Sequence, residues 1–290
     1  MKDKSSSRNK ALLVAPASIW IGTFLVLPLI GLAILSFLTR SGYGEIGLPW
    51  TFDNFKRFAG FGFFGFDPVY PLIFARTFML ALSTTLITAI LSLPLAFFIA
   101  SLSGRWRAIA LTMVIIPFWT NLLIRTYAWQ ILLANDSVIA NTFRALGLMV
   151  EGQSLVPSLG AIYIGMICDF LPYMVLPVYA SVEKVDWRLA EAARDLGARG
   201  GSVFRHAIWP QIVPGIGAGV FLTFVPALGQ YVVPDLLGGA KTAMLGNTIA
   251  QQFGASRDWP FGAAISLVAM TLILMGLWIR TVCFKKQEAQ

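Results

Sequence analysis

The sequence predicts an all-α, polytopic membrane protein with six transmembrane helices. Three observations support this class: the composition, six long apolar runs, and the way Lys and Arg are distributed between those runs. Of the 290 residues, 57% are hydrophobic and only 12% are charged, and the mean hydropathy is +0.73. Because soluble domains carry about 25% charged residues, this composition alone indicates a chain built for lipid.

The six runs carry at most one charged residue each. A bilayer core is crossed by about 20 residues of helix, so each run is long enough for one span. Prolines inside several runs are tolerated because neighbouring helices can satisfy the freed carbonyls. We therefore expect residues 1–290 to form a single transmembrane domain, with spans at 13–37, 77–102, 109–134, 157–181, 211–234 and 259–281.

The basic residues indicate the orientation. With both termini inside, the inner segments hold 14 of the 22 Lys and Arg residues and the outer segments hold 7, with Arg125 inside a span. Such an excess marks the cytoplasmic side, so both termini and the loop 183–210 are predicted to be cytoplasmic. The charge-free run 11–39 is too long for a cleaved signal peptide and is interpreted as the first span.

Several classes of protein find no support. The net charge of +8 is spread over the edges of apolar runs, so no nucleic-acid partner is expected. One histidine and two cysteines give no metal site, and no catalytic motif is present. The segment ending in Lys241 and Thr242 lacks the glycines of a phosphate-binding loop, so no nucleotide site is expected in this chain. Gly215 and Gly219 suit close packing of two helices.

The loop 183–210 is the one long charged segment between apolar runs. Asp186 is a plausible N-cap, residues 187–196 a short helix, and Gly197 the following position with positive φ. Ser202 could cap a second short helix, and Pro210 marks the start of the next span. One face of the first helix is apolar, through Leu189, Ala192, Ala193 and Leu196. A helix of this kind outside the bilayer suits docking into another protein's groove.

Glu191, Ala192 and Ala193, followed by Gly197 and by Ile208-Trp209-Pro210, resemble the EAA loop of permease subunits of ATP-binding-cassette (ABC) importers. The resemblance implies a type I importer permease fold in which this loop is the cytoplasmic coupling helix. The implied coupling residues are Glu191, Ala192, Ala193, Asp195, Gly197 and Pro210.

Further segments resemble the spermidine/putrescine permeases: 117–127, 170–177, 181–186, 236–241 and 257–262. The resemblance implies a subunit for polyamine import across the bacterial inner membrane. It also implies a second, similar permease chain, two ATPase subunits that bind ATP and Mg, and a periplasmic binding protein. This chain would hold no cofactor and catalyse no reaction itself.

Arg125 and Asp169 are the ionisable residues inside the predicted spans, and such residues are costly in lipid. One interpretation is that the two form a pair across the bundle, which gives Arg125 a structural role. A second is that Asp169 faces the pathway and, with Trp119 and Tyr173, attracts a cationic substrate. A third is a protonated or otherwise satisfied Asp169. The predicted path residues are Trp119, Asn121, Asp169, Tyr173 and Tyr231.

Two alternatives to polyamine import stay open. Asp169 departs from the resembled permeases, so the same architecture could serve an amino-acid derivative, a thiamine-like cation or a phosphonate. A stand-alone secondary transporter or channel driven through Asp169 would instead work without ATP. The outer loop 39–76 is rich in aromatic residues, which suit either the lipid headgroup level or a surface that receives another protein.

Overall fold

A computed structural model describes residues 14–62, 65–147, 154–239 and 242–287, with side chains described as far as residue 276. The described chain is mainly helical and divides into two compact units. The terminal unit comprises residues 1–71 and 248–290, and the central unit comprises residues 72–247.

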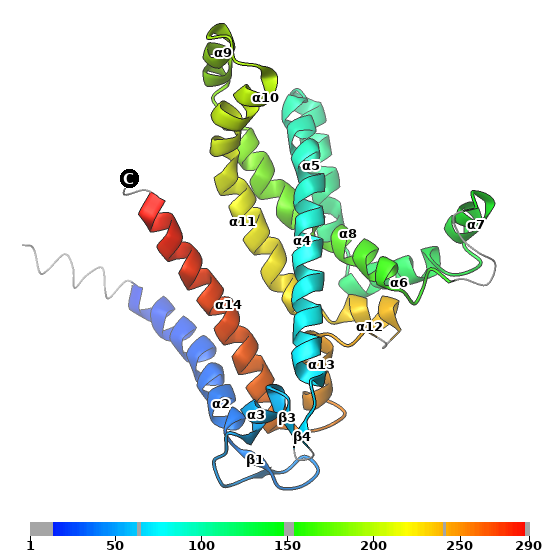
Figure 1. The fold of residues 1–290 in the computed structure, drawn as a ribbon, viewed down its shortest axis with the longest axis vertical. Helices are drawn as coiled ribbons and strands as arrows, with labels where there is room; N and C mark the ends of the chain where they lie inside the picture. Colours follow the sequence, from blue (N-terminus) through cyan, green and yellow to red (C-terminus); the bar gives the residue numbers. More distant parts are fainter. Residues whose placement is uncertain (1–13, 63–64, 148–153, 240–241, 288–290) are drawn as a thin grey trace, which may run out of the picture. The chain divides into compact units, whose positions relative to one another are not determined.

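The terminal unit pairs the first and last spans. The helix Val14–Ser36 contains the π-helical turn η1 (Gly22–Val26) and α2 (Leu27–Ser36), and α2 packs along α14 (Trp259–Gln287) (Figure 1). The outer loop follows α2, and its described residues form short elements. It contains an antiparallel pair, β1 (Thr39–Arg40) with β2 (Ile46–Gly47), then α3 (Asp53–Phe58), and a second pair, β3 (Phe61–Gly62) with β4 (Gly65–Phe66).

Arg57 connects α3 to the first turn of α14. The Arg57 guanidinium lies 4.0 Å from the centre of the Phe261 ring, and its Nη1 is 2.8 Å from Oδ2 of Asp258. Asp258 is buried and also accepts a hydrogen bond from the backbone N–H of Phe261. Phe37 packs against Trp50, Phe52 and Phe55, which closes the other side of this outer loop.

The central unit holds the remaining helices, and their bounds follow in chain order (Figure 1). They are α4 (Val69–Ser101, which begins in the terminal unit), α5 (Gly104–Trp119), α6 (Leu122–Leu132), α7 (Val138–Ala145), α8 (Leu159–Val182), α9 (Trp187–Asp195), α10 (Gly200–Val203), the π-helical turn η2 (Phe204–Ile208), α11 (Trp209–Leu228), α12 (Val232–Gly238) and α13 (Leu245–Phe253), which ends in the terminal unit.

The central unit is built around α8, whose packing with α11 depends on glycine. A Cβ atom added to Gly215 would lie 2.6 Å from the carbonyl oxygen of Pro177, and one added to Gly219 would lie 2.6 Å from the sulfur of Met174. The two backbones therefore approach more closely than any larger residue would allow. The predicted role of Gly215 and Gly219 in close helix packing is confirmed.

The predicted spans agree with the helices in number but not in every boundary. Among the described residues, five helices are long and apolar enough to cross a bilayer, and α5 with α6 completes a sixth crossing if counted as one broken span. The second span begins earlier than predicted, within a helix that starts at Val69. The fifth span ends at Leu228, and residues 232–238 form the separate helix α12.

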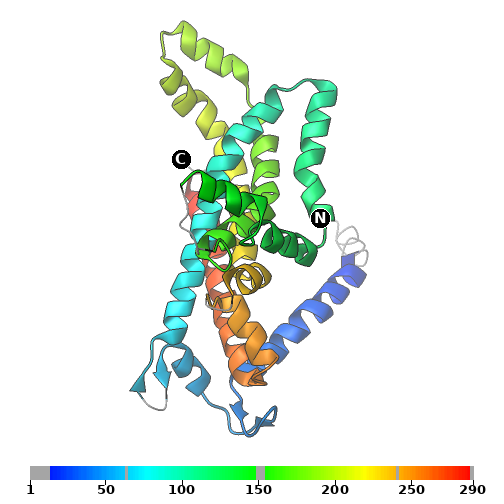
Figure 2. The ribbon, with the colours of Figure 1, turned by 90° about the vertical axis from the view of Figure 1, so that its right-hand side faces the viewer.

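The third span, predicted as one helix over 109–134, is broken. α5 ends at Trp119, α6 begins at Leu122, and their axes differ by 97° (Figures 1 and 2). Thr120 and Asn121 have extended backbones, and the Asn121 side chain accepts a hydrogen bond from the N–H of Leu123 as the N-cap of α6. Helix restarts there because an asparagine cap satisfies one of the free N–H groups.

Candidate coupling site and translocation path

α9 begins at Trp187 as the sequence predicts and ends at Asp195, one residue earlier than predicted. The Asp186 side chain accepts a hydrogen bond of 3.0 Å from the N–H of Arg188, which confirms it as the N-cap. Gly197 has φ +82°, and the N–H groups of Gly197 and Ala198 bond the carbonyls of Arg194 and Ala193. These two hydrogen bonds form a Schellman motif, which requires the left-handed conformation that glycine adopts without strain.

The apolar residues of α9 divide between two faces instead of sharing the one predicted. Ala190 is buried and Ala193 is half-buried against a core that includes Val203 and Ile208. Leu189, Ala192 and Leu196 point outward, and 89% of Leu196 is exposed. The small alanines allow α9 to lie close to the following turn, while the leucines form an uncovered stripe.

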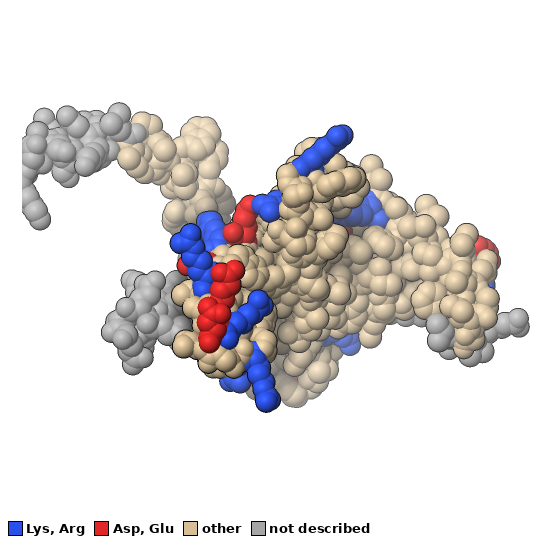
Figure 3. All heavy atoms as spheres, turned by 90° about the horizontal axis from the view of Figure 1, so that it is seen from above, with Lys and Arg blue, Asp and Glu red and all other residues tan. Residues whose placement is uncertain are grey.

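Charged side chains surround that stripe. Figure 3 shows Lys, Arg, Asp and Glu gathered on the end of the central unit that carries α9 and α10. The exposed charged residues of this segment are Arg188, Glu191, Arg194, Asp195, Arg199 and Arg205. An amphipathic helix with an exposed apolar stripe bordered by both signs of charge can bind a groove in a partner protein.

Gln211 of α11 forms hydrogen bonds with the N-cap residue of α9 and with the turn that precedes α11. Its Oε1 accepts a hydrogen bond of 2.9 Å from the N–H of Asp186, and its Nε2 donates to the carbonyl of Ala207 at 2.6 Å. Pro210 lies at the start of α11, as predicted, and has no N–H to donate to the preceding turn. The predicted cap role of Ser202 is wrong, because α10 begins at Gly200 with Arg199 as its N-cap, so Ser202 lies inside the helix.

Arg125 and Asp169 form an ion pair, which is the first of the interpretations left open for them. Nε of Arg125 lies 2.5 Å from Oδ1 of Asp169, and Nη1 of the same guanidinium donates to the carbonyl oxygen of Pro117. Asp169 is buried on α8, Arg125 is on α6 and Pro117 is in the last turn of α5. One guanidinium therefore joins the two halves of the broken span to α8.

The predicted path residues are only partly assembled. Tyr173 lies one helical turn after Asp169 on α8, and its ring centre is 4.4 Å from that of Phe118. Trp119 and Asn121 lie at the break between α5 and α6 and are exposed. Tyr231 is exposed at the N-cap of α12, where its carbonyl accepts a hydrogen bond from Asn247.

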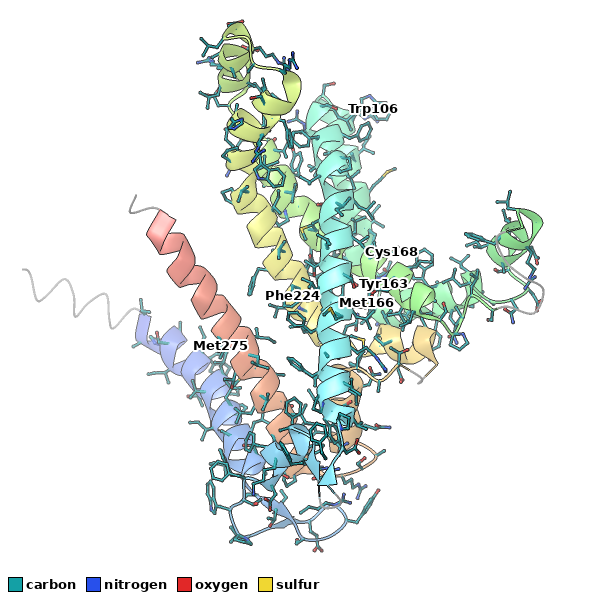
Figure 4. The ribbon with its side chains drawn as sticks, viewed as in Figure 1. Trp106, Tyr163, Met166, Cys168, Phe224 and Met275 are labelled. Atoms are coloured by element: carbon teal, nitrogen blue, oxygen red, sulfur yellow. The ribbon has the colours of Figure 1, made fainter. Side chains whose placement is uncertain are left out.

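Buried hydroxyl groups also lie on α4, which belongs largely to the central unit. Five hydroxyl residues of α4 are buried, and the Ser83 hydroxyl lies 2.8 Å from the hydroxyl of Tyr163 on α8. Tyr163, Met166 and Cys168 lie along α8 in the middle of the central unit (Figure 4). The α4 residues are Thr77, Thr84, Thr85, Thr88 and Ser92. Sequence reasoning missed this hydroxyl stripe, although its recurrence at helical spacing was a visible signal.

Comparison with known proteins defines the class and then the family. The chain is similar in fold to the crystal structure of a bacterial ABC transporter involved in the import of the acidic polysaccharide alginate, with a TM-score of 0.67, 17% identity, and coverage of 94% of this chain and 96% of that one. The fold is thus that of an ABC importer permease, a multi-pass membrane protein. No family model matches the chain.

Sequence relatives narrow the class. The chain is 37% identical over 278 residues to the spermidine/putrescine transport system permease protein PotB of Salmonella typhimurium, covering 95% of this chain and 94% of the relative. It is 38% identical over 262 residues to the PotB of Escherichia coli, covering 89% and 93%. The Haemophilus influenzae protein of that name is 34% identical, covering 90% and 88%. The chain belongs to this family of spermidine/putrescine transport permeases.

Proposed function

We propose that this chain is the transmembrane subunit of an importer that carries polyamines across the bacterial inner membrane. The similarity to the three PotB proteins over about nine-tenths of the chain supports the substrate class. The orientation follows from the distribution of Lys and Arg, with both termini and α9 on the cytoplasmic side. Residues 1–290 act as a single transmembrane domain in this proposal.

The coupling site is α9 with its flanking residues. The uncovered stripe of Leu189, Ala192 and Leu196 enters a groove of an ATPase subunit, and Glu191 and Asp195 border the contact. Two such ATPases bind ATP and Mg and carry out hydrolysis, while a second permease chain completes the pathway. Closure of the ATPase pair displaces α9, and the helices then open toward a periplasmic binding protein.

The path residues Trp119, Asn121, Asp169, Tyr173 and Tyr231 are proposed to contact the substrate. Oδ1 of Asp169 is held by Arg125, but Oδ2 is buried and has no hydrogen-bond partner among the described residues. A carboxylate oxygen without a partner suits a protonated amine, and Tyr173, one helical turn after Asp169 on α8, packs its ring against Phe118 and Phe170. This group of residues explains how a pathway of apolar helices accepts a cation.

The test reconstitutes the chain with its ATPase, second permease and binding protein in liposomes and measures spermidine uptake. ATP-dependent uptake is expected from the complete complex, and none from this chain alone. Glu191→Lys and Gly197→Asp should abolish uptake while membrane insertion is intact, because the first alters the docking surface and the second strains a left-handed position. Unaltered transport by both variants would reject the coupling site, and ATP-independent uptake by the chain alone would establish the stand-alone transporter.

A ligand screen by thermal shift on the binding protein separates polyamines from the other candidate solutes. Stabilisation by spermidine or putrescine supports the proposal. Stabilisation only by an amino-acid derivative, a thiamine-like cation or a phosphonate would show that the importer carries that solute instead of a polyamine. Asp169→Asn should lower the uptake of a polyamine, and indifference to this substitution would remove Asp169 from the path.

A further inference from the structure

Arg107 joins three helices at the end of the central unit that carries α9. Its Nε donates to the carbonyl of Leu102 at 3.0 Å, its Nη2 to the carbonyl of Ala100 at 3.0 Å, and its Nη1 to Oε1 of Glu183 at 3.1 Å. The two carbonyls belong to the end of α4, where backbone acceptors lack helical partners. Glu183 is the C-cap of α8. A single guanidinium of α5 therefore connects α4, α5 and α8.

The connection from Glu183 to α9 is short and hydrogen-bonded throughout. Glu183, Lys184 and Val185 each donate a backbone N–H to a carbonyl of the last turns of α8, and Val185 is buried. The next residue, Asp186, is the N-cap of α9 and is bonded to Gln211 of α11. The base of α9 is thus held on one side by α11 and on the other, through Glu183, by α4 and α5.

The energetics point to a geometric role. About a third of the Arg107 side chain and half of the Glu183 side chain are exposed, and ion pairs of this kind add little to stability. The guanidinium differs from an ammonium group in its fixed fork of donors, which can bond several acceptors in set directions at once. Arg107 uses three of these donors on three different residues, so it fixes the relative positions of the helix ends.

We propose that Arg107 is a positioning residue that transmits the displacement of α9 to the α4–α5 pair. This inference rests on the proposed function, in which an ATPase acts on α9. The direct route runs from α9 through the chain into α8 and through Gln211 into α11. Arg107 adds the second route, so that α4, α5 and α8 move together when α9 moves. Trp106, the chain neighbour of Arg107, lies at the end of the α4–α5 pair in Figure 4.

The experiment uses the complete reconstituted complex and measures polyamine taken up per ATP hydrolysed. Arg107→Gln should keep hydrolysis stimulated by the binding protein within about twofold of the wild type while uptake falls about tenfold, because α9 moves without α4 and α5. Glu183→Gln should change the ratio in the same direction, and the double variant should be no worse than Arg107→Gln. Arg107→Lys should be intermediate. The matched control is Arg105→Gln, which removes the same charge from an exposed position on the same turn.

An unchanged ratio in Arg107→Gln overturns the inference, whether uptake and hydrolysis are both normal or fall together. A general loss of folding would appear as lower thermal stability of the purified complex and an equal loss of both activities, which also rejects the positioning role. Failure of the proposed function gives a different result. In that case the wild-type complex shows no ATP-dependent uptake, or Glu191→Lys leaves both uptake and stimulated hydrolysis unaltered.

Discussion

Removing Arg125 should destabilise the protein more than removing its partner Asp169. The ion pair is unevenly buried, with 20% of the Arg125 side chain and 4% of the Asp169 side chain exposed. Arg125→Met leaves a buried carboxylate without its cation, and a loss of this kind costs about 3–5 kcal/mol. The direct attraction is of the same order, since unit charges about 4 Å apart at an effective dielectric constant near 20 attract by about 4 kcal/mol.

Asp169→Asn leaves a partly exposed guanidinium that still donates to the carbonyl of Pro117, so its cost should be about 1–3 kcal/mol. In the double variant Arg125→Met/Asp169→Leu no charge stays buried, and the loss should be smaller than the sum of the single losses by about 2 kcal/mol or more.

The assay is thermal unfolding of the purified protein followed by tryptophan fluorescence. For a domain of this size each kcal/mol corresponds to about 2–4 °C, so Arg125→Met should lower the Tm by roughly 10 °C. Arg144→Met is the control, because Arg144 on α7 donates to Oδ1 of Asn141 and to the carbonyl of Asn135, two neutral acceptors in exposed bonds. Equal and small shifts for the two single variants, with simple addition in the double variant, would refute this account of the ion pair.

Two further perturbations test the packing described above. Gly215→Ala forces a Cβ against the carbonyl of Pro177 and should lower the free energy of unfolding by about 1–3 kcal/mol. Gly276→Ala is the control and should have little effect, because nothing lies within 4 Å of the added atom. The same Tm for both variants would contradict the close approach of α8 and α11. Arg57→Leu leaves Asp258 without its 2.8 Å partner and should speed proteolysis of the outer loop near α3. Lys56→Leu, which alters an exposed pair with Asp53, should not change the cleavage rate. Equal cleavage rates for the two variants would show that Arg57 does not anchor the loop.

Sequence reasoning succeeded where the determining chemistry is local. The caps of α9 depend on Asp186 and Gly197, which act within a few residues, and both were predicted correctly. The close contact through Gly215 and Gly219 was also predicted, because spacing along one helix reveals it without knowledge of the neighbour. Hydropathy located the spans for the same reason, since each run is a property of one stretch of chain.

The missed features depend on direction or on distant partners. A hydropathy profile counts apolar residues and carries no information on the direction of the chain, so it predicts one continuous third span. The break at Asn121 was therefore missed, although Pro117 and Asn121 are residues that can end and restart a helix. The division of the apolar residues of α9 between two faces depends on the core that α10 and η2 provide. Gln211 and Arg107 act on residues 25 and 76 positions away, which no local pattern indicates.

The sharp bend between α5 and α6 limits how the pathway can open. Hydrocarbon offers no water to replace a broken hydrogen bond, so each exposed backbone group at a bend needs a partner within the protein. Asn121 serves the N–H of Leu123, and Arg125 serves the carbonyl of Pro117. In a continuous helix the same two groups would bond Trp119 and Asn121 instead, so the elbow is held by the Asn121 cap and by the guanidinium of Arg125, which also binds Asp169. Movement of α5, α6 and α8 as one preformed block keeps all of these bonds while access alternates between the two sides of the membrane.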